Sequence, residues 1–252
     1  MPARLPELIR LSIDDGIATL TLNRPEARNA LSLELIQAMG EGVRAVAADS
    51  SVRVLIVGGE GKVFCAGMDL KAVASDAIAM GEMLRELSRV TRALRRLPIP
   101  TIARVQGAAV GGGCGIMVVC DFAVTHAEAK VGYPEVDLGV CPAVVAPWLI
   151  RRIGAGRARA MLLAGGTMSG AEGFEAGLAT HLCQASELEG TAATLAKRLV
   201  GGGPNALAAT KRWLNELDGS DDDAVLDKAA EISATIIAGD EAQSRLRAIF
   251  NR

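Results

Sequence analysis

A run of glycines joins an apolar strand to an apolar helix in the segment Gln106-Gly107-Ala108-Ala109-Val110-Gly111-Gly112-Gly113-Cys114-Gly115-Ile116-Met117-Val118-Val119-Cys120-Asp121. Because Gly111, Gly112 and Gly113 carry no side chains, a ligand can approach the main chain closely there. The free N–H groups at the start of the following helix favour negative charge. The segment therefore predicts an anion or oxyanion site, with a tightly packed glycine turn as the structural alternative.

Two phosphate-binding motifs fail to fit this segment. A dinucleotide fingerprint that starts at Gly111 requires a small residue at position 116, which is Ile116. A P-loop that starts at Gly107 requires lysine at position 113, which is Gly113. The glycine run alone leaves the anion site and the packing turn equally open.

Composition limits the class of protein. The chain has 252 residues, of which 50% are hydrophobic and only 3% aromatic, so its core must consist mainly of Ala, Val, Leu and Ile. That length fits one large domain, or a domain with an appendage. With 27 basic and 29 acidic residues the net charge is −2, unlike the basic footprint of nucleic-acid-binding proteins. We therefore expect no nucleic-acid partner.

Cysteine usage and hydropathy indicate the compartment. The five cysteines form an odd set without a CxxC pair, which is typical of reduced thiols in a cytosolic protein. Residues 1–15 contain no apolar core of the signal-peptide type. The longest uncharged run, 105–120, is shorter than a membrane span. We therefore expect a soluble, cytoplasmic protein with no membrane partner.

The order of predicted elements indicates an α/β core. Alternating apolar residues predict a hairpin at 8–22, and Ser32 is the predicted N-cap of a helix that ends near Ala48. Buried strands are predicted at 52–57 and Thr101–Val105, each followed by a glycine turn and then a helix. Two such units in succession would place the two main-chain turns side by side, where an active site is expected.

The rest of the chain is predominantly helical. Short strands are predicted at 122–125 and Lys130–Gly132. Helices are predicted at 155–163, 170–176, 188–199, 206–217, 222–238 and Asp240–Phe250. The apolar faces of these helices exceed the needs of one small core, which favours an assembly role for the C-terminal region.

Four motifs, in this order, resemble the crotonase superfamily, the enoyl-CoA hydratase and isomerase family. They are Leu20-Thr21-Leu22-Asn23-Arg24-Pro25, Phe64-Cys65-Ala66-Gly67-Met68-Asp69-Leu70, the glycine segment 107–121, and Pro134-Glu135-Val136-Asp137-Leu138-Gly139-Val140-Cys141-Pro142. The resemblance implies an α/β fold with a ββα spiral core and a helical C-terminal region that forms homotrimers, commonly paired as a dimer of trimers. Residues 1–200 would form the core with an acyl-CoA site. Residues 201–252, after the hinge Gly201-Gly202-Gly203-Pro204, would form the assembly region.

The resemblance also implies a set of site residues. The substrate would be an acyl-CoA thioester whose oxygen is held by the N–H groups at Ala66 and Gly112, where charge develops in the transition state. Glu135 matches the family's acid/base glutamate, although a glutamate after proline is also a common helix-start residue. The further positions implied for substrate binding are Arg28, Gly67, Met68, Asp69, Leu70, Gly111, Pro134 and Cys141. No metal is implied, and coenzyme A enters only as part of the substrate.

Gly115 departs from the pattern of the two-glutamate hydratases, which carry a second glutamate there. Single-glutamate relatives include isomerases that move a double bond between positions 3 and 2, and hydratases of the methylglutaconyl type. Residues 135–154 resemble the second group. We therefore predict an enoyl-CoA hydratase that uses Glu135 alone. A Δ3,Δ2-enoyl-CoA isomerase and a non-catalytic acyl-CoA-binding scaffold are the alternatives.

Other reactive residues have simpler interpretations. His126 and His181 are predicted at surface turns or strand ends and have no nucleophile in a recognisable motif, which argues against a hydrolytic triad. Cys114 and Cys120 are expected to pack in the core, and Cys141 could border the pocket without a chemical role.

The remaining charges are expected to be structural. Asp69 and Asp121 are interpreted as a helix-start and a strand-end charge, although Asp69 adjoins the turn expected to contact the CoA adenine. Arg245, Arg247 and Arg252 are interpreted as surface charges on a helix, with contact to CoA phosphates as the alternative.

Overall fold

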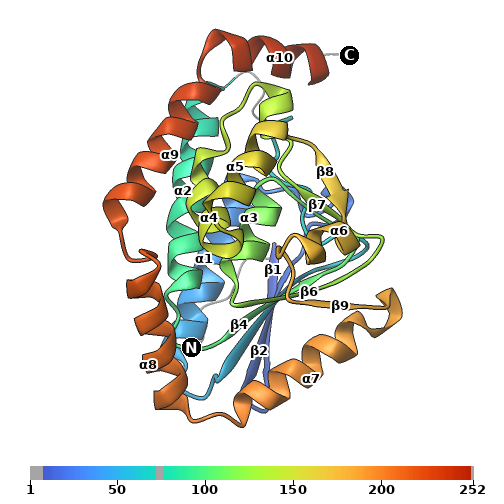
Figure 1. Ribbon diagram of the computed structural model, residues 1–252, viewed down its shortest axis with the longest axis vertical. Coiled ribbons are helices and arrows are strands. Elements are labelled where there is room, and N and C mark those ends of the chain that lie inside the picture. Colours follow the sequence, from blue (N-terminus) through green and yellow to red (C-terminus); the bar gives the residue numbers. More distant parts are fainter. Residues whose placement is uncertain (1–7, 72–75, 251–252) are drawn as a thin grey trace.

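The computed structural model describes residues 8–71 and 76–250, and two sheets organise this part of the chain (Figure 1). In the larger sheet β1 is antiparallel to β2 and the other neighbours are parallel. Its spatial order is β1 (Ile9–Asp14), β2 (Ile17–Leu22), β3 (Val54–Gly59), β4 (Thr101–Val105), β6 (Phe122–His126) and β9 (His181–Cys183). The smaller sheet has the order β5 (Ala108–Val110), β7 (Lys130–Gly132) and β8 (Thr167–Ser169).

The N-terminal elements form as their local sequence predicts. Asp15 and Gly16 turn the β1–β2 hairpin with φ values of 46° and 76°, the left-handed conformation that such two-residue turns require. Ser32 caps α1 (Leu33–Ala48) by accepting a hydrogen bond from the Leu35 N–H. The predicted hairpin and first helix are thus confirmed.

Helices cover both faces of the larger sheet. On one face α1, α2 (Ala77–Arg95) and α3 (Gly112–Val119) contribute to the main apolar core. On the other face α7 (Leu188–Val200) packs Leu188, Ala192 and Leu195 against side chains of β3, β4 and β6 (Figure 1). All six residues of β3 are buried, as expected for a parallel strand with both faces covered.

Short elements connect the core to the C-terminal helices. They are η1 (Pro25–Ala27), η2 (Glu135–Leu138), η3 (Pro142–Val144), α4 (Ala146–Ile153), α5 (Ala155–Ala164), α6 (Gly170–Glu175) and η4 (Ala185–Glu187). The chain then forms α8 (Pro204–Leu217), α9 (Asp223–Ile237) and α10 (Asp240–Phe250), drawn orange to red along one side and the top of Figure 1. The Ser233 hydroxyl ties α9 to η3, because it accepts from the Val144 N–H at 2.9 Å and donates to the Cys141 carbonyl at 2.8 Å.

The elements differ from the sequence predictions at several places. β3 begins at Val54 and includes Gly58 and Gly59, which were expected in the turn. α2 begins at Ala77 with Asp76 as its N-cap, so Asp69 is not a helix-start charge. The strands β5, β8 and β9 were not predicted, because each has only three residues and depends on its partner strands.

Two further expectations concern the whole chain. Over the part that the structure describes, no helix combines the length and apolarity that a membrane crossing demands. α9 packs along α2 of the core, and α10 contacts η2. The division into a core (1–200) and an assembly region (201–252) stays a prediction.

Candidate active site

Hydrogen bonds join the two glycine turns directly. The Phe64 N–H donates to the Gln106 carbonyl at 2.8 Å, and the Cys65 N–H donates to the Ala108 carbonyl at 3.0 Å. The Val110 N–H returns a bond to the Cys65 carbonyl at 3.1 Å. A Cβ at Gly113 would lie 2.6 Å from the Cys65 carbonyl oxygen, so this approach requires glycine. The predicted side-by-side arrangement of the turns is confirmed.

A small apolar cavity of about 90 Å³ lies where these turns meet η2, η3, α2 and α9. Nine of the predicted site residues line it, namely Ala66, Gly67, Met68, Leu70, Gly111, Gly112, Pro134, Glu135 and Cys141. The rest of the lining is Leu84, Leu87, Val110, Leu138, Val140, Pro142, Val144, Val145 and Ile237. Glu135 is therefore the one ionisable carboxyl in a predominantly aliphatic wall.

Glu135 starts η2, and its carboxyl group is held in a dry position. A Cβ at Gly111 would lie 3.0 Å from Oε1, so the carboxyl packs on the bare main chain of the glycine turn. Oε2 is buried and has no hydrogen-bond partner among the described residues. Burial raises the pKa of Glu135 to about 7, a nearby main-chain hydrogen bond opposes this, and the charge of Asp137 adds to it. A carboxyl with this pKa can both accept and return a proton near neutral pH.

Main-chain N–H groups also form part of the cavity wall. Within the described residues, no acceptor is found for the N–H groups of Met68 and Gly112. Gly112 is the first residue of α3, where the N–H has no partner in its own helix. A Cβ at Gly112 would lie 3.5 Å from Met68 Sδ, so the two residues are close neighbours. Both N–H groups therefore belong to neighbouring residues of the same cavity wall.

The donor expected at Ala66 needs correction. The Ala66 N–H already donates to the Arg28 carbonyl at 3.1 Å, in the contact that fixes the first turn against the 24–30 loop. Two hydrogen bonds flank Met68, because the Leu31 N–H donates to the Gly67 carbonyl and the Asp69 N–H donates to the Leu31 carbonyl. The Met68 N–H therefore lies on the other side of the strand. The Ala66 N–H is thus occupied, whereas the Met68 N–H, two residues on, has no acceptor among the described residues.

Two other predicted substrate contacts lie outside the cavity lining. Arg28 is exposed and adopts a left-handed conformation with a φ of 55°, so only its main chain reaches the first turn. Asp69 accepts a hydrogen bond of 2.6 Å from the Arg24 guanidinium. Arg245 and Arg247 are exposed on α10, as expected of surface charges, and Arg252 lies outside the described residues.

Val145 and Ile237 are pocket residues that no motif indicated. Val145 immediately precedes α4, and a Cβ at Gly115 would lie 2.6 Å from its Cγ1 atom. Ile237 is the last residue of α9 and brings the C-terminal helices to the pocket. Leu84 and Leu87 come from the buried face of α2, and their spacing of three is the only sequence signal for this wall.

The cysteines and histidines have structural roles. Burial raises the pKa of Cys65, Cys114 and Cys120 to about 12, so these thiols stay protonated in the core. His126 Nε2 accepts from the Gly107 N–H at 3.1 Å while Nδ1 lies 3.0 Å from Glu128. Over residues 8–71 and 76–250 no group of three or more metal-ligating side chains is found.

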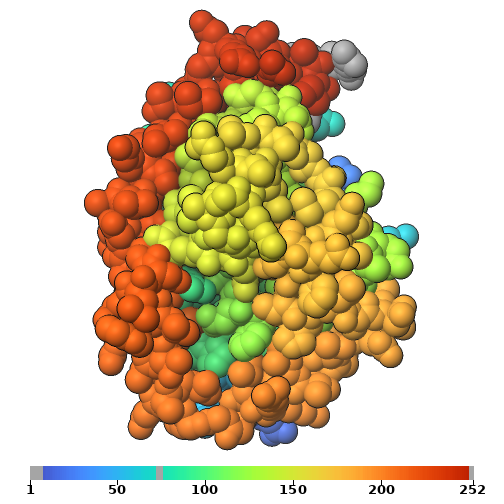
Figure 2. Space-filling view, viewed as in Figure 1, coloured from blue at the N-terminus to red at the C-terminus, as the bar shows by residue number. Residues whose placement is uncertain are grey.

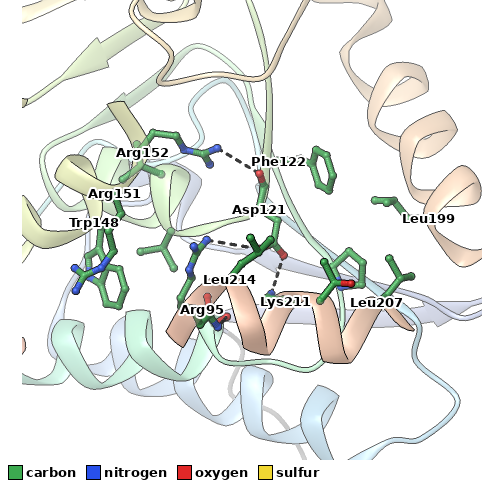
Figure 3. A pocket seen from close by; sticks show the side chains of 15 residues that line it. Arg95, Asp121, Phe122, Trp148, Arg151, Arg152, Leu199, Leu207, Lys211 and Leu214 are labelled. Carbon is green, nitrogen blue, oxygen red and sulfur yellow. Dashed lines mark hydrogen bonds and ion pairs between the residues drawn. The ribbon is translucent and has the colours of Figure 1, made fainter. Parts of the chain in front are cut away.

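A second cavity, of about 370 Å³, lies between α8 and the core. Figure 2 shows the surface hollowed between α8, α7 and the α4–α5 segment. Figure 3 shows that Arg95 and Lys211 point toward Asp121 in this cavity. The Lys211 ammonium, on a side chain that is 8% exposed overall, lies 2.7 Å from Asp121 Oδ2. Asp121 also accepts from the N–H and hydroxyl of Thr101, so this half-buried carboxylate is an anchor for α8 rather than a simple strand-end charge.

Two of the arginines that line this second cavity, Arg151 and Arg152, bind main-chain carbonyls at helix ends. Arg152 donates to the carbonyls of Cys120 and Asp121, at the end of α3 (Figure 3). Arg151 donates to the carbonyls of Asp218 and Gly219, at the end of α8, and its guanidinium lies 5.2 Å from the Trp148 ring centre. A cation at a helix C-terminus satisfies free carbonyls and favours the helix dipole. Arg151 and Arg152 therefore have structural roles. The candidate catalytic residues line the smaller cavity instead.

The carboxyl of Glu135 and the N–H groups of Met68 and Gly112 thus belong to one cavity on a glycine-rich α/β core. Residues 12–248 match the enoyl-CoA hydratase/isomerase family. The chain is 33% identical to a crotonyl-CoA hydratase of Syntrophomonas wolfei, over 90% of this chain and 87% of that protein. It is 33% identical to the mitochondrial methylglutaconyl-CoA hydratase of Mus musculus, over 80% of this chain and 66% of that protein.

The fold agrees with this relationship. A crystal structure of an enoyl-CoA hydratase from Bacillus halodurans superposes with a TM-score of 0.88 at 26% identity, covering 96% of this chain and 100% of that one. The chain belongs to the enoyl-CoA hydratase/isomerase family, and its fold is the crotonase fold. The predicted resemblance is thereby confirmed.

Proposed function

We propose that this protein is an enoyl-CoA hydratase that acts through an oxyanion-stabilised thioester enolate and one catalytic carboxyl group, Glu135. The observation that carries the proposal is the unpartnered Oε2 of Glu135 in a cavity whose wall also holds the free N–H groups of Met68 and Gly112. Similarity to the crotonyl-CoA hydratase of Syntrophomonas wolfei supports the same reaction.

The proposed role of each group follows from where negative charge develops during the reaction. The thioester oxygen would accept hydrogen bonds from the Met68 and Gly112 N–H groups, which stabilise it most as it becomes an enolate oxygen. Ionised Glu135 would take a proton from water as the water oxygen bonds to C3. The proton would then be delivered to C2, so that one water is added across the C2=C3 bond and the carboxylate is restored.

The proposed acyl group is short and uncharged. The cavity is small, and no Lys, Arg or His side chain is among its described lining residues. An acyl carboxylate would have to be buried without a cationic partner and near Glu135, which is costly. We therefore expect crotonyl-CoA to be processed faster than 3-methylglutaconyl-CoA, although the chain is also similar to a methylglutaconyl-CoA hydratase.

A Δ3,Δ2-enoyl-CoA isomerase is the second candidate function, and one contact favours it. Val145 fills the space beside Gly115, where a second water-holding carboxyl would have to project. Moving a double bond requires only that Glu135 carry a proton from C2 to C4 of the dienolate. The non-catalytic scaffold is the third possibility, and it predicts acyl-CoA binding without turnover.

We also propose a homotrimer or a dimer of trimers. Large apolar side chains stand exposed on α8 and α9, which supports a buried interface there; they are Trp213, Leu214, Leu217, Val225, Ile232 and Ile236. The proposal needs no metal and no cofactor besides the coenzyme A of the substrate. A cytoplasmic location stays a prediction that rests on the unpaired cysteines.

The test is a panel of 2-enoyl-CoA and 3-enoyl-CoA thioesters, with products followed in heavy water. Glu135→Gln keeps the shape of the side chain and removes the base, so crotonyl-CoA should still bind while turnover falls about 10²- to 10⁴-fold. Glu175→Gln is the matched control, because Glu175 is exposed on α6 and does not line the cavity. Full turnover by a folded Glu135→Gln protein would overturn the assignment.

A further inference from the structure

Val145 closes the cavity wall over Gly115. Its side chain is 1% exposed and lines the same cavity as Glu135. Gly115 lies one helical turn after Gly111, whose carbonyl accepts from the Gly115 N–H at 2.9 Å. Because a Cβ at Gly115 would lie 2.6 Å from Val145 Cγ1, any side chain at position 115 would require Val145 to move.

This packing leaves the cavity with few polar partners for a water molecule. A bound water is ordinarily held by two to four polar groups. Among the described lining residues, only Glu135 has a side chain with an oxygen or nitrogen atom, and the N–H groups of Met68 and Gly112 are those proposed to hold the thioester oxygen. A water beside Glu135 thus faces an aliphatic surface where Val145 stands.

We propose that Val145 is a specificity-determining residue that holds back the addition of water relative to the migration of a double bond. The inference rests on the proposed function, since it requires that Glu135 acts on an acyl-CoA. In the migration, ionised Glu135 takes the C2 proton of a 3-enoyl-CoA, and the electrons of that C–H bond form the C2=C3 bond. The C3=C4 pair then takes the same proton at C4, which restores the carboxylate and consumes no water.

Hydration differs because its water must be held in place before it can attack. Val145 provides contact surface for the acyl carbons but no hydrogen-bond partner for that water. A hydroxyl group at the same place would supply one partner without a change of side-chain shape. The ratio of hydration to migration is therefore the quantity that residue 145 controls.

The test is Val145→Thr, measured with a 2-enoyl-CoA and a 3-enoyl-CoA of the same chain length. The ratio of hydration rate to double-bond migration rate should rise about tenfold or more, which is the effect of about 1.4 kcal/mol. Val118→Thr is the control, because Val118 is buried on α3 but does not line the cavity of Glu135. It introduces the same buried hydroxyl and should leave the ratio unchanged.

A second variant covers the case in which the threonine variant does not fold. Val145→Ala makes room for water beside Gly115 and should raise the ratio in the same direction. An unchanged or lower ratio in a folded variant that still moves double bonds would overturn the role of Val145 and leave the proposed function standing. A wild-type protein that turns over neither thioester would overturn the proposed function and this inference with it.

Discussion

The carboxyl of Glu135 rests on the main chain of Gly111, and a Cβ at that glycine would lie 3.0 Å from Oε1. Gly111 has a φ of 54°, a backbone conformation that residues other than glycine rarely adopt. The same glycine turn therefore does two things. It leads into the Gly112 N–H at the start of α3, and it leaves space for the Glu135 carboxyl, whose Oε2 atom is shielded from solvent.

Gly111→Ala should disturb both the turn that leads to the Gly112 N–H and the position of the Glu135 carboxyl. The strained backbone should cost about 1–3 kcal/mol of unfolding free energy, and the displaced carboxyl should lower turnover on the order of 10- to 100-fold. Gly156→Ala is the matched control, because Gly156 lies in α5 with no atom within 4 Å of the added Cβ. That variant should be neutral or slightly more stable in chemical denaturation. Equal effects of the two substitutions on stability and turnover would contradict the proposed role of Gly111.

The pH dependence of activity should follow Glu135. Its pKa is raised to about 7, and the base must be ionised before it can take a proton from water. The kcat/KM for hydration should therefore rise with pH and level off above a midpoint near 7. The measurement is a pH–rate profile with wild-type protein. A midpoint close to the ordinary value of 4.5 would show that the carboxyl is solvated in the working enzyme.

The same pKa predicts how stability changes with pH. Between 4.5 and about 7 the folded protein keeps the Glu135 proton while the unfolded chain has lost it. The folded state thus binds more protons, and stability must fall as pH rises through this window. Relative to Glu135→Gln, the wild type should lose roughly 1–3 kcal/mol of unfolding free energy across it. Parallel stability curves for the two proteins would exclude a buried carboxyl of this kind.

The fold could be predicted from the sequence because the order of the motifs can be recognised without knowing which residues meet in space. The two strand–turn–helix units and the Ser32 cap depend on local patterns, and all are present, although β3 runs on through Gly59 and α2 begins only at Ala77. The choice between Ala66 and Met68 as a donor could not be made in this way. It depends on the Arg28 carbonyl, which reaches the first turn from a distant loop and occupies the Ala66 N–H.

Some residues that line the pocket could not be predicted from the sequence either. Val145 stands outside the short motif that contains Glu135, and Ile237 reaches the cavity from the end of α9. Both are ordinary apolar residues in sequence, and only the chain path shows which cavity they line. Asp121 was likewise expected to be a simple end-of-strand charge, because its partner Lys211 lies on α8, far along the chain.

The main-chain donor at Gly112 can be removed by Gly112→Pro. Proline is tolerated at the first position of a helix, where Gly112 stands in α3. Loss of the N–H should reduce kcat about 10²- to 10³-fold. Gly112→Ala is the control, because its Cβ meets the same neighbours, Leu31 and Leu87 at 3.1 Å, yet the N–H is kept. The assignment fails if both folded variants lose the same amount of activity.

The ion pair between buried Lys211 and half-buried Asp121 should hold α8 on the core. Lys211→Met leaves Asp121 without its closest cation and should cost roughly 3–5 kcal/mol of unfolding free energy. Lys197→Met, on the exposed face of α7, should change stability by less than about 1 kcal/mol. Chemical denaturation gives both values, and hydrogen exchange in α8 should rise selectively in the first variant. Similar stability losses at the two lysines would contradict the anchoring role.

The packing of Val145 on Gly115 makes one double variant informative. Gly115→Glu alone should destabilise the protein, because the new Cβ would lie 2.6 Å from Val145 Cγ1. Combined with Val145→Ala, the same glutamate gains space and should recover at least about 1 kcal/mol of stability, a coupling that a double-mutant cycle measures. In the double variant two carboxyls would share the cavity. Hydration of crotonyl-CoA should then increase relative to Val145→Ala alone, and its pH midpoint should move upward because like charges raise the pKa of Glu135. Additive stability changes with no gain in hydration would show that the space beside Gly115 does not face the reacting carbons.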